Sequence, residues 1–365
     1  MDALTTLSNW QRVRLGDICE IKREVRITKN ELDVFGKYPV VSGGVGFLGY
    51  TNNFNRYENT ITIAQYGTAG YVNFQKNKFW ANDVCFCIYP NKDIIKNIFL
   101  YYFLKVNQNY LYEISNRNAT PYSISKDKIL DFEILLPPLD EQIAIANILS
   151  ALDHYLYSLR ALILKKESVK KALSFELLSQ RKRLKGFNQA WQRVKLGDIC
   201  EITTGSLDAN EMVHYGKYRF YTCAKEYYFI DKYAFDTEAI LISGNGAYVG
   251  YVHYYKGKFN AYQRTYVLDN FSEHIIFVKY FLAMFLQSHI QTNRNEGNTP
   301  YIVMATLKDF EIPLPPLNEQ IAIANILSAL DHEIISLKNK KRQFDNIKKA
   351  LNHDLMSAKI RVLKK

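Results

Sequence analysis

The chain has 365 residues, of which 48% are hydrophobic, and this is enough for two domains of ordinary size and argues against a globally disordered protein. Its net charge of +11 permits a polyanionic partner but does not identify one. Five cysteines, an odd number, argue against a disulfide framework, so we expect a reducing, cytoplasmic location. Residues 1–9 do not have the pattern of a signal peptide, and the most apolar windows, 98–106 and 275–286, are too short to span a membrane.

Two sequence blocks each occur twice in the chain. WQRVRLGDICEI at residues 10–21 returns at 191–202 with one difference, and LPPLDEQIAIANILSALDH at 136–154 returns at 314–332 with one difference. The residues between these blocks have diverged. Such a pattern predicts two variable domains on one shared framework, each with its own specificity, although a recent duplication followed by neutral drift would leave the same trace.

The repeats divide the chain into four segments. We expect a first variable domain at 1–136, a fixed segment at 137–184, a second variable domain at 185–314 and a second fixed segment at 315–365. The excess positive charge lies mostly in the fixed segments, and the second variable domain is close to neutral. Charge alone therefore does not identify the variable domains as nucleic-acid readers.

The variable domains mix short β-rich runs with aromatic helices. The runs lie at 60–64, 84–89, 239–242 and 265–268, and the helices lie near 97–106 and 275–289. Glycine-rich turns at 42–46 and 243–246 separate them. We therefore predict a compact α+β fold for each domain.

The fixed segments are predicted to form two helices of about 40 residues. Paired prolines at 137–138 and 315–316 end whatever precedes them, and Asp140 and Asn318 are suitable N-caps. Apolar residues then recur at alternating spacings of four and three, which predicts a coiled coil whose simplest partner is the other copy. The predicted seam residues are Ile148, Leu152, Leu159, Val169 and Leu173 in the first helix, and Ile326, Leu330, Leu337, Phe344, Ile347 and Leu351 in the second.

A search for catalytic motifs finds none that is complete. The two LPPL sequences do not have the amide and aromatic residues of an adenine methyltransferase loop, and Tyr50 stands where a phosphate-binding loop needs lysine. Asp17, Glu20 and Lys22 resemble part of a nuclease site, but the repeat has no matching lysine. Cys85 and Cys87 have no second pair at zinc spacing. We therefore predict no catalytic residue, no metal ion and no cofactor.

The duplicated block P-P-L-x-E-Q-x-x-I-A-x-x-L at 137–149 and 315–327 resembles the signature of specificity subunits of type I restriction-modification systems. The opening W-x-x-V-x-L-G-D-I at 10–18 and 191–199 is similar to the start of that family's domains, and so is T-G-S at 204–206. The first copy has Lys-Arg-Glu at 22–24 in that place, so its loop is expected to differ in shape.

The resemblance implies a non-catalytic recognition subunit. Each variable domain would be a target-recognition domain that reads one half of a split, asymmetric site in double-stranded DNA. The two helices would pack as an antiparallel coiled coil, set the distance between the domains and bind two methyltransferase subunits, through which restriction subunits join. S-adenosylmethionine and ATP would belong to those partners.

Candidate DNA-binding residues are polar or basic side chains on predicted loops, because phosphate contacts position a protein and base contacts specify the sequence. In the first domain they are Lys22, Arg23, Arg26, Gln65, Tyr66, Thr68, Arg117, Asn118, Thr120 and Tyr122. In the second they are Thr203, Thr204, Asn245, Tyr248, Gln263, Arg264, Arg294, Asn298, Thr299 and Tyr301. For any one of them, ordinary solvated surface is an equally good interpretation, and Tyr122 and Tyr301 also fit a framework role.

Three other interpretations stay open. The chain could be the specificity module of a type II-like (IIB or IIG) restriction-methylation enzyme, which differs mainly in its partner. A free-standing nuclease or methyltransferase is opposed by the missing motifs. The near-neutral second domain leaves room for a coiled-coil scaffold that does not bind DNA.

Overall fold

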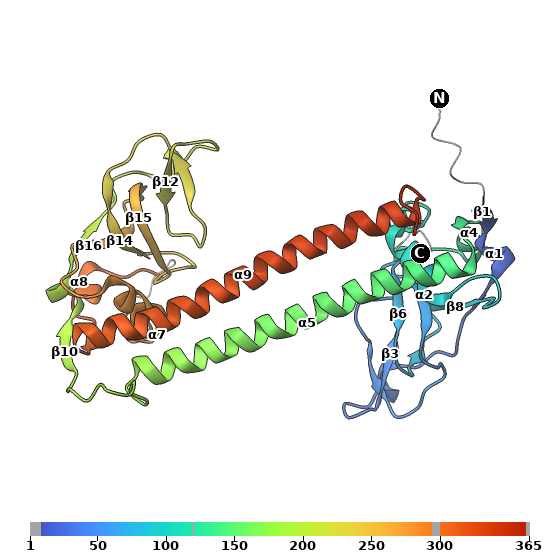
Figure 1. Cartoon of the computed structure of the whole chain (residues 1–365), viewed down its shortest axis with the longest axis horizontal. Coiled ribbons are helices and arrows are strands. Elements are labelled where there is room, and N and C mark those ends of the chain that lie inside the picture. The colour runs from blue at the N-terminus through green and yellow to red at the C-terminus, as the bar shows by residue number, and fades with distance from the viewer. Residues whose placement is uncertain (1–8, 119, 294–299, 363–365) are drawn as a thin grey trace. The chain divides into compact units, whose positions relative to one another are not determined.

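The computed structural model describes residues 9–118, 120–293 and 300–362. The chain divides into two compact units, one made of residues 1–160 and 339–365 and the other of residues 161–338 (Figure 1). Each unit therefore contains one variable segment, the beginning of the helix that follows it and the end of the other helix. The two long helices are α5 (Leu139–Leu178) and α9 (Leu317–Met356), each of 40 residues, as predicted.

The first unit is an α+β fold with three small sheets. A four-stranded sheet has the order β2-β8-β5-β6, a three-stranded sheet has the order β4-β3-β7, and β1 pairs with β9. The strands are β1 (Gln11–Arg14), β2 (Cys19–Lys22), β3 (Tyr38–Val41), β4 (Gly49–Thr51), β5 (Thr60–Ala64), β6 (Val72–Gln75), β7 (Trp80–Ala81), β8 (Cys85–Pro90) and β9 (Glu133–Leu136). The shorter helices are α1 (Leu15–Ile18), α2 (Asn97–Val106), α3 (Gln108–Glu113) and α4 (Lys126–Leu130), with a 3-10 turn, η1 (Lys29–Glu31).

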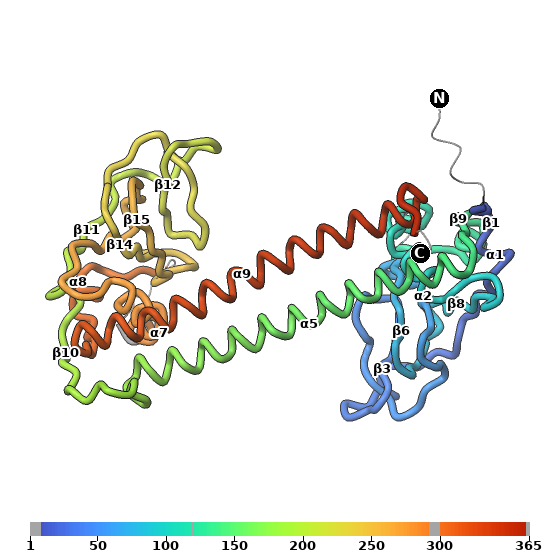
Figure 2. Tube along the Cα trace, in the orientation of Figure 1, coloured from blue at the N-terminus to red at the C-terminus, as the bar shows by residue number. Residues whose placement is uncertain are grey.

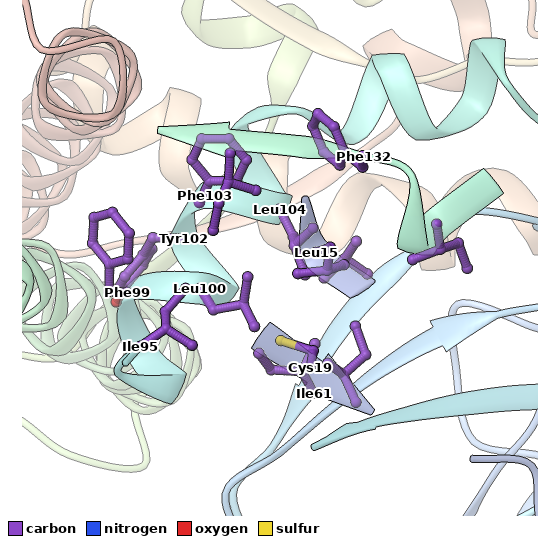
Figure 3. Close-up of a cluster of buried hydrophobic side chains, with 14 of the residues drawn as sticks. Leu15, Cys19, Ile61, Ile95, Phe99, Leu100, Tyr102, Phe103, Leu104 and Phe132 are labelled. Carbon is purple, nitrogen blue, oxygen red and sulfur yellow. The ribbon is translucent and has the colours of Figure 1, made fainter. Parts of the chain in front are cut away.

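The main core of this unit lies between α2 and the four-stranded sheet. Figure 3 shows side chains from α1, α2 and β5 converging there, among them Leu15, Leu104 and Ile61, all fully buried. Ile145 and Leu149 of α5 and Leu355 of α9 belong to the same core. The unit is therefore completed by both long helices.

The second unit repeats this plan with one continuous sheet of order β11-β16-β14-β15-β12-β13, and β10 pairs with β17. The strands are β10 (Gln192–Lys195), β11 (Glu201–Thr204), β12 (Tyr218–Tyr221), β13 (Tyr228–Ile230), β14 (Phe235–Ser243), β15 (Val252–Ala261), β16 (Thr265–Asp269) and β17 (Glu311–Leu314). The helices are α6 (Leu196–Ile199), α7 (Ile275–Asn293) and α8 (Met304–Lys308), with a 3-10 turn, η2 (Ala209–Glu211). The sheet is continuous because β15 is long enough to pair with both β14 and β12.

The α+β prediction is confirmed in both units. The predicted strands appear as β5 and β8 and within β14 and β16, and the aromatic helices appear as α2 and α7. The strands at the two ends of each variable segment pair with each other, β1 with β9 and β10 with β17, in the same register. The near-identical sequences at the two ends of each variable segment therefore build the same strand pair in both units.

The glutamate of the P-P-L-x-E-Q block is the centre of a buried clamp in the first unit. Glu141 accepts hydrogen bonds from Trp10 Nε1 at 3.1 Å and from Arg361 Nε and Nη2 at 2.7 and 2.8 Å. Burial by itself would raise the pKa of Glu141, but the bonds from Arg361 and Trp10 outweigh burial and lower this pKa. The stabilisation is thus present above the ordinary carboxyl pKa and is lost as the pH falls through the lowered folded-state value.

The second unit builds the same clamp from equivalent residues. Glu319 accepts a bond from Trp191 Nε1 at 3.2 Å and a bidentate pair from Arg183 at 2.8 and 2.7 Å, and its side chain is 0% exposed. Arg361 follows α9 and binds the start of α5, whereas Arg183 follows α5 and binds the start of α9. Figure 2 shows the chain after α9 returning to the unit in which α5 begins.

The glutamine of the same block orders the chain that leads into the aromatic helix. Gln142 accepts a bond from the Lys96 amide at 2.8 Å and donates to the Pro137 carbonyl at 2.8 Å, just before α2. Gln320 does the same with the His274 amide and the Pro315 carbonyl, at 3.0 and 2.9 Å, just before α7. Both glutamines are buried.

The long helices pair antiparallel within each unit. In the first unit Asp153 of α5 accepts a bond from Tyr102 at 2.6 Å and binds Lys348 of α9. Asp331, Tyr280 and Lys170 form the equivalent network in the second unit. Higher residue numbers in α5 meet lower numbers in α9, as Tyr155–Phe344 and Lys166–Glu333 also show.

Three of the eleven predicted seam residues are exposed, and the other eight are buried or partly buried. Leu152, Leu159, Leu173, Ile326, Leu330, Leu337, Phe344 and Leu351 are buried or partly buried. Ile148, Val169 and Ile347 are exposed instead, and the next residues, Leu149, Lys170 and Lys348, turn inward. The inward face is rotated because each helix must contact both its own domain core and the other helix, and the lysine ammonium groups reach aspartates there.

The clamp predicts that Arg183→Ala will lower the free energy of unfolding by about 3–5 kcal/mol, because it leaves a buried carboxylate without its cation. Arg193→Ala is the matched control, because its pair with Glu311 is exposed on both sides and should contribute about 1 kcal/mol or less. Urea denaturation followed by circular dichroism measures both. Equal midpoints for the two variants would contradict the clamp.

Candidate nucleic-acid interface

Three loops of the first unit are hydrogen-bonded to one another at one edge. The Gly67 amide donates to the Tyr122 carbonyl at 3.1 Å, and the Ile124 amide donates to the Gln65 carbonyl at 3.0 Å. Thr68 donates from its amide and its hydroxyl to the Gly43 carbonyl, at 3.0 and 2.7 Å. The loops 42–46, 65–70, 116–118 and 120–123 therefore form one surface, which we call the loop cluster.

The second unit has the same backbone ladder. The Gly246 amide donates to the Pro300 carbonyl at 2.9 Å, and the Ile302 amide donates to the Gly244 carbonyl at 2.9 Å. Gly67 and Gly246 have φ values of +75° and +81°, a conformation that favours glycine. The Gly244 amide donates in turn to the Arg264 carbonyl at 2.8 Å. One backbone design thus presents two different sets of side chains.

The cations of the first loop cluster are held by specific contacts. Arg117 lies over the rings of Tyr112 and Tyr122 at 5.0 and 4.9 Å and donates to the Tyr112 carbonyl at 3.2 Å. Arg23 donates to the Asp83 carbonyl at 3.3 Å, and the adjoining Val84 carbonyl accepts the Gln65 amide at 2.9 Å. Two arginines far apart in sequence are therefore attached to one cluster.

The candidate residues of the first domain fall into three groups. Lys22, Arg23, Arg26, Arg117, Asn118, Thr120 and Tyr122 are exposed, and Tyr66 and Thr68 are partly buried. Gln65 is buried, and its side-chain oxygen has no protein partner among the described residues. Its backbone supports the cluster, while its side chain points inward. Lys22 also forms an ion pair with Glu20 at 3.0 Å.

In the second domain Thr203, Thr204, Tyr248, Gln263, Arg264 and Tyr301 are exposed and Asn245 is partly buried. Thr203 and Thr204 pair with the strand that begins beside Arg264, and Asn245 forms a β-bridge with Tyr301. Arg294, Asn298 and Thr299 lie outside the described residues. The second loop cluster consists of the loops around residues 244–246, Arg264 and residues 300–302. Among its described candidate residues, Arg264 is the one cation.

Sequence reasoning missed two exposed aromatic side chains, Phe35 and Tyr215. They stand at the same place in the repeat, in Phe-Gly-Lys-Tyr at 35–38 and Tyr-Gly-Lys-Tyr at 215–218. This shared tetrapeptide could have identified them.

Within the described ranges, no group of three or more His, Cys, Asp and Glu side chains could hold a metal ion. No helix in the described part of the chain is long and apolar enough to cross a membrane.

Fold and loops together define a class of protein with two α+β domains, each presenting its own loop cluster from a shared framework tied by two long helices. The family model described as "Type I restriction modification DNA specificity domain" matches residues 7–167 and again 188–344. The chain therefore belongs to this family, as a subunit that recognises DNA sequence, and the scaffold alternative is not favoured.

Several type I specificity subunits are similar to this chain. The EcoDI specificity subunit of Escherichia coli is 38% identical over 46% of this chain and 37% of its own length. A putative type I specificity subunit of Mycoplasma genitalium is 25% identical over 91% of this chain and 90% of its own. The putative MjaX subunit of Methanocaldococcus jannaschii is 30% identical over 75% and 70%.

Among solved structures, a type I restriction-modification S subunit from M. genitalium has the same fold, with a TM-score of 0.75 and 21% identity over 95% of this chain and 96% of that one.

The first loop cluster predicts that Arg117→Ala will weaken DNA binding by about 1–3 kcal/mol, or five- to 150-fold, if the guanidinium contacts a base. Arg12→Ala is the matched control, because Arg12 is an exposed arginine of the same unit outside the cluster. Selection of bound duplexes from a randomised library should show relaxed preference in one half of the target only. Unchanged affinity and target for Arg117→Ala would remove this residue from the interface.

Proposed function

We propose that this chain is the subunit of a type I restriction-modification complex that binds double-stranded DNA sequence-specifically, each domain reading one half of a bipartite asymmetric target. The recognition domains are residues 1–136 and 185–314, and the spacer segments are 137–184 and 315–365. The observation that carries this proposal is the backbone ladder at Gly67 and Gly246, which is the same in both units while the side chains around it differ.

A bipartite target follows from the size of the readers. A small domain that inserts loops into one major groove reads only a few base pairs, whereas two domains joined by paired helices read two short blocks with a gap between them. A repeat with pseudo-two-fold symmetry also suits the symmetry of the duplex backbone. The differing loop clusters make the two blocks different.

The chemistry is assigned to partner subunits. Methyltransferase subunits, two in number, and restriction subunits would supply methylation and cleavage, and would bind S-adenosylmethionine and ATP. All five cysteines are free, which suits a reducing cytoplasm.

Equivalent exposed apolar residues on the two helices fit two copies of one partner. Tyr157 of α5 and Ile335 of α9 are 77% and 54% exposed and stand at the same position of the repeat. Ile143 and Ile321, also exposed and equivalent, lie fourteen residues earlier, which is about four turns and therefore on the same helix face. Each helix thus has one exposed apolar stripe to which one copy of the partner could bind.

Tyr157→Asp or Ile335→Asp alone should therefore reduce the bound methyltransferase from two copies to one, and the double variant should bind none. The charge would be buried against an apolar partner surface, whereas in the free chain both sites face water. Native mass spectrometry of the co-expressed complex counts the copies, with the exposed Ser168→Asp as control. Two copies retained on the double variant would show that the partner docks elsewhere.

We also expect the helices to set the gap in the target. Inserting four residues after Arg160 and four after Lys338 would lengthen the helix pair by about 6 Å and add a rotation of about 40°. One base pair of DNA contributes about 3.4 Å and, at about 10.5 base pairs per turn, roughly 34°. The gap should therefore grow by one or two base pairs.

Selection from a library with randomised sequence and spacing measures this. The wild-type chain should select two short blocks at one spacing, and the insertion variant should select the same blocks farther apart. A wild-type target of one continuous block would contradict the proposed function. A variant that keeps the original gap would show that the helices do not measure it.

A further inference from the structure

Each unit exposes one large aromatic side chain almost completely. Phe35 is 93% exposed and Tyr215 is 96% exposed, and each directly precedes a Gly-Lys-Tyr whose tyrosine begins β3 or β12. An isolated exposed aromatic residue needs no explanation, but the same residue class at the same position of two otherwise divergent domains indicates a shared use.

The loop that carries Phe35 is tied down by local hydrogen bonds. A capping box joins Thr28 and Glu31, with the Thr28 amide donating to Glu31 at 2.7 Å. The carboxylate of Asp33 accepts the Phe35 amide at 2.9 Å. A Cβ added to Gly36 would lie 2.4 Å from the Thr51 amide nitrogen, so only glycine allows this turn to press against β4. These contacts fix the backbone of the loop, and the Phe35 ring extends from it into solvent. We call this exposed aromatic residue and its loop the first tip.

The second unit builds the same support from different residues. A capping box joins Asp208 and Glu211, with the Asp208 amide donating to Glu211 at 3.3 Å. The Val213 amide donates to the Phe229 carbonyl at 2.9 Å. A Cβ on Gly216 would lie 2.5 Å from the Ile230 amide nitrogen. The residues of the supporting loop differ between the units, but both loops present an exposed aromatic residue. Tyr215 and its loop are the second tip.

Each tip is connected to its loop cluster by one short strand. β3 runs from the first tip to Ser42 and Gly43, and the Gly43 carbonyl binds Thr68. β12 runs from the second tip to Cys223, whose Sγ donates to the Arg264 carbonyl at 3.2 Å. Four strand residues span about 13 Å, which equals about four base pairs of DNA.

Each tip also has an exposed lysine two residues after its aromatic residue and lies away from the helices. Lys37 and Lys217, both exposed, follow the two glycines. Within each unit, β3 and β12 lie in the part farthest from α5 and α9 (Figure 1). DNA that continues past the loop cluster would therefore reach the tips more readily than a protein bound to the helices.

We propose that Phe35 and Tyr215 contact the DNA that flanks each half of the target, with the ring against the minor-groove sugars and Lys37 or Lys217 on a phosphate. This inference rests on the proposed function. The contact lies about four base pairs from the bases read by the loop cluster, and it carries no sequence information, because sugars and phosphates are the same at every step. The tips add affinity and register, and the loop clusters add specificity.

Phe35→Ala with Tyr215→Ala tests the proposal in the assembly that binds DNA, the full chain with its co-expressed methyltransferase. Affinity should fall at least ten-fold with the selected target unchanged, and hydroxyl-radical protection should be lost at the flanking positions only. Phe35→Tyr with Tyr215→Phe should retain both. Lys37→Gln with Lys217→Gln should reduce the slope of log affinity against log salt by about two, at about 0.9 for each phosphate contact.

Both rings are so exposed that their removal leaves the fold intact, and circular dichroism verifies this. Unchanged affinity and footprint in the double alanine variant would overturn the inference while leaving the proposed function in place. Loss of the methyltransferase with DNA affinity of the remaining assembly unchanged would also overturn it, and would assign the tips to a protein partner. A wild-type assembly that selects no target would instead contradict the proposed function itself.

Discussion

A carboxylate that water cannot reach needs a cation beside it, and each long helix of this protein begins with such a carboxylate. Glu319 obtains its cation from Arg183, which follows α5, and Glu141 obtains its cation from Arg361, which follows α9. The start of each helix is therefore stable only when the end of the other helix is present. Each unit is built from two distant stretches of chain, and this requirement accounts for the near-identity of the block that carries the glutamate, at 136–154 and 314–332.

The same constraint separates stability from specificity. The clamps, the two buried glutamines and the Tyr–Asp–Lys networks each centre on a residue of the repeated blocks, Glu141, Gln142 or Asp153 in the first unit. The loop clusters use residues between the blocks. Gly67 and Gly246 carry the backbone ladder in both units, so neighbouring side chains can change without loss of the ladder. Under the proposed function, recognition of a new half-target would require changes at exposed positions such as Arg117 or Arg264.

The sequence was sufficient for the features whose signals are local. Prolines at 137–138 and an apolar period near 3.5 residues predict α5, and β-rich runs predict β5 and β8. Contacts between distant residues left no local signal: Trp10 and Arg361 meet at Glu141 across 131 and 220 residues. The sequence predicts Ile148 in the seam, but Leu149 is the buried residue. The apolar period predicts a helix with one buried face, but it does not show which of two neighbouring residues lies at the centre of that face. Base-reading residues stay predictions, because exposure makes Arg117 available to DNA but does not select its contact.

The two long helices differ in sequence after the repeated block, and one pair of contacts there shows that α5 and α9 are complementary to each other. Tyr155 packs on Phe344 at 4.7 Å between ring centroids, and the equivalent pair, Lys166 and Glu333, forms an ion pair at 2.9 Å. If each helix met a copy of itself in the same register, Tyr155 would face Lys166 and Glu333 would face Phe344. The second arrangement would bury part of a carboxylate against a ring with no cation, which is unfavourable. At this place the residues in which the two helices differ are therefore matched across the seam, Tyr155 by Phe344 and Lys166 by Glu333.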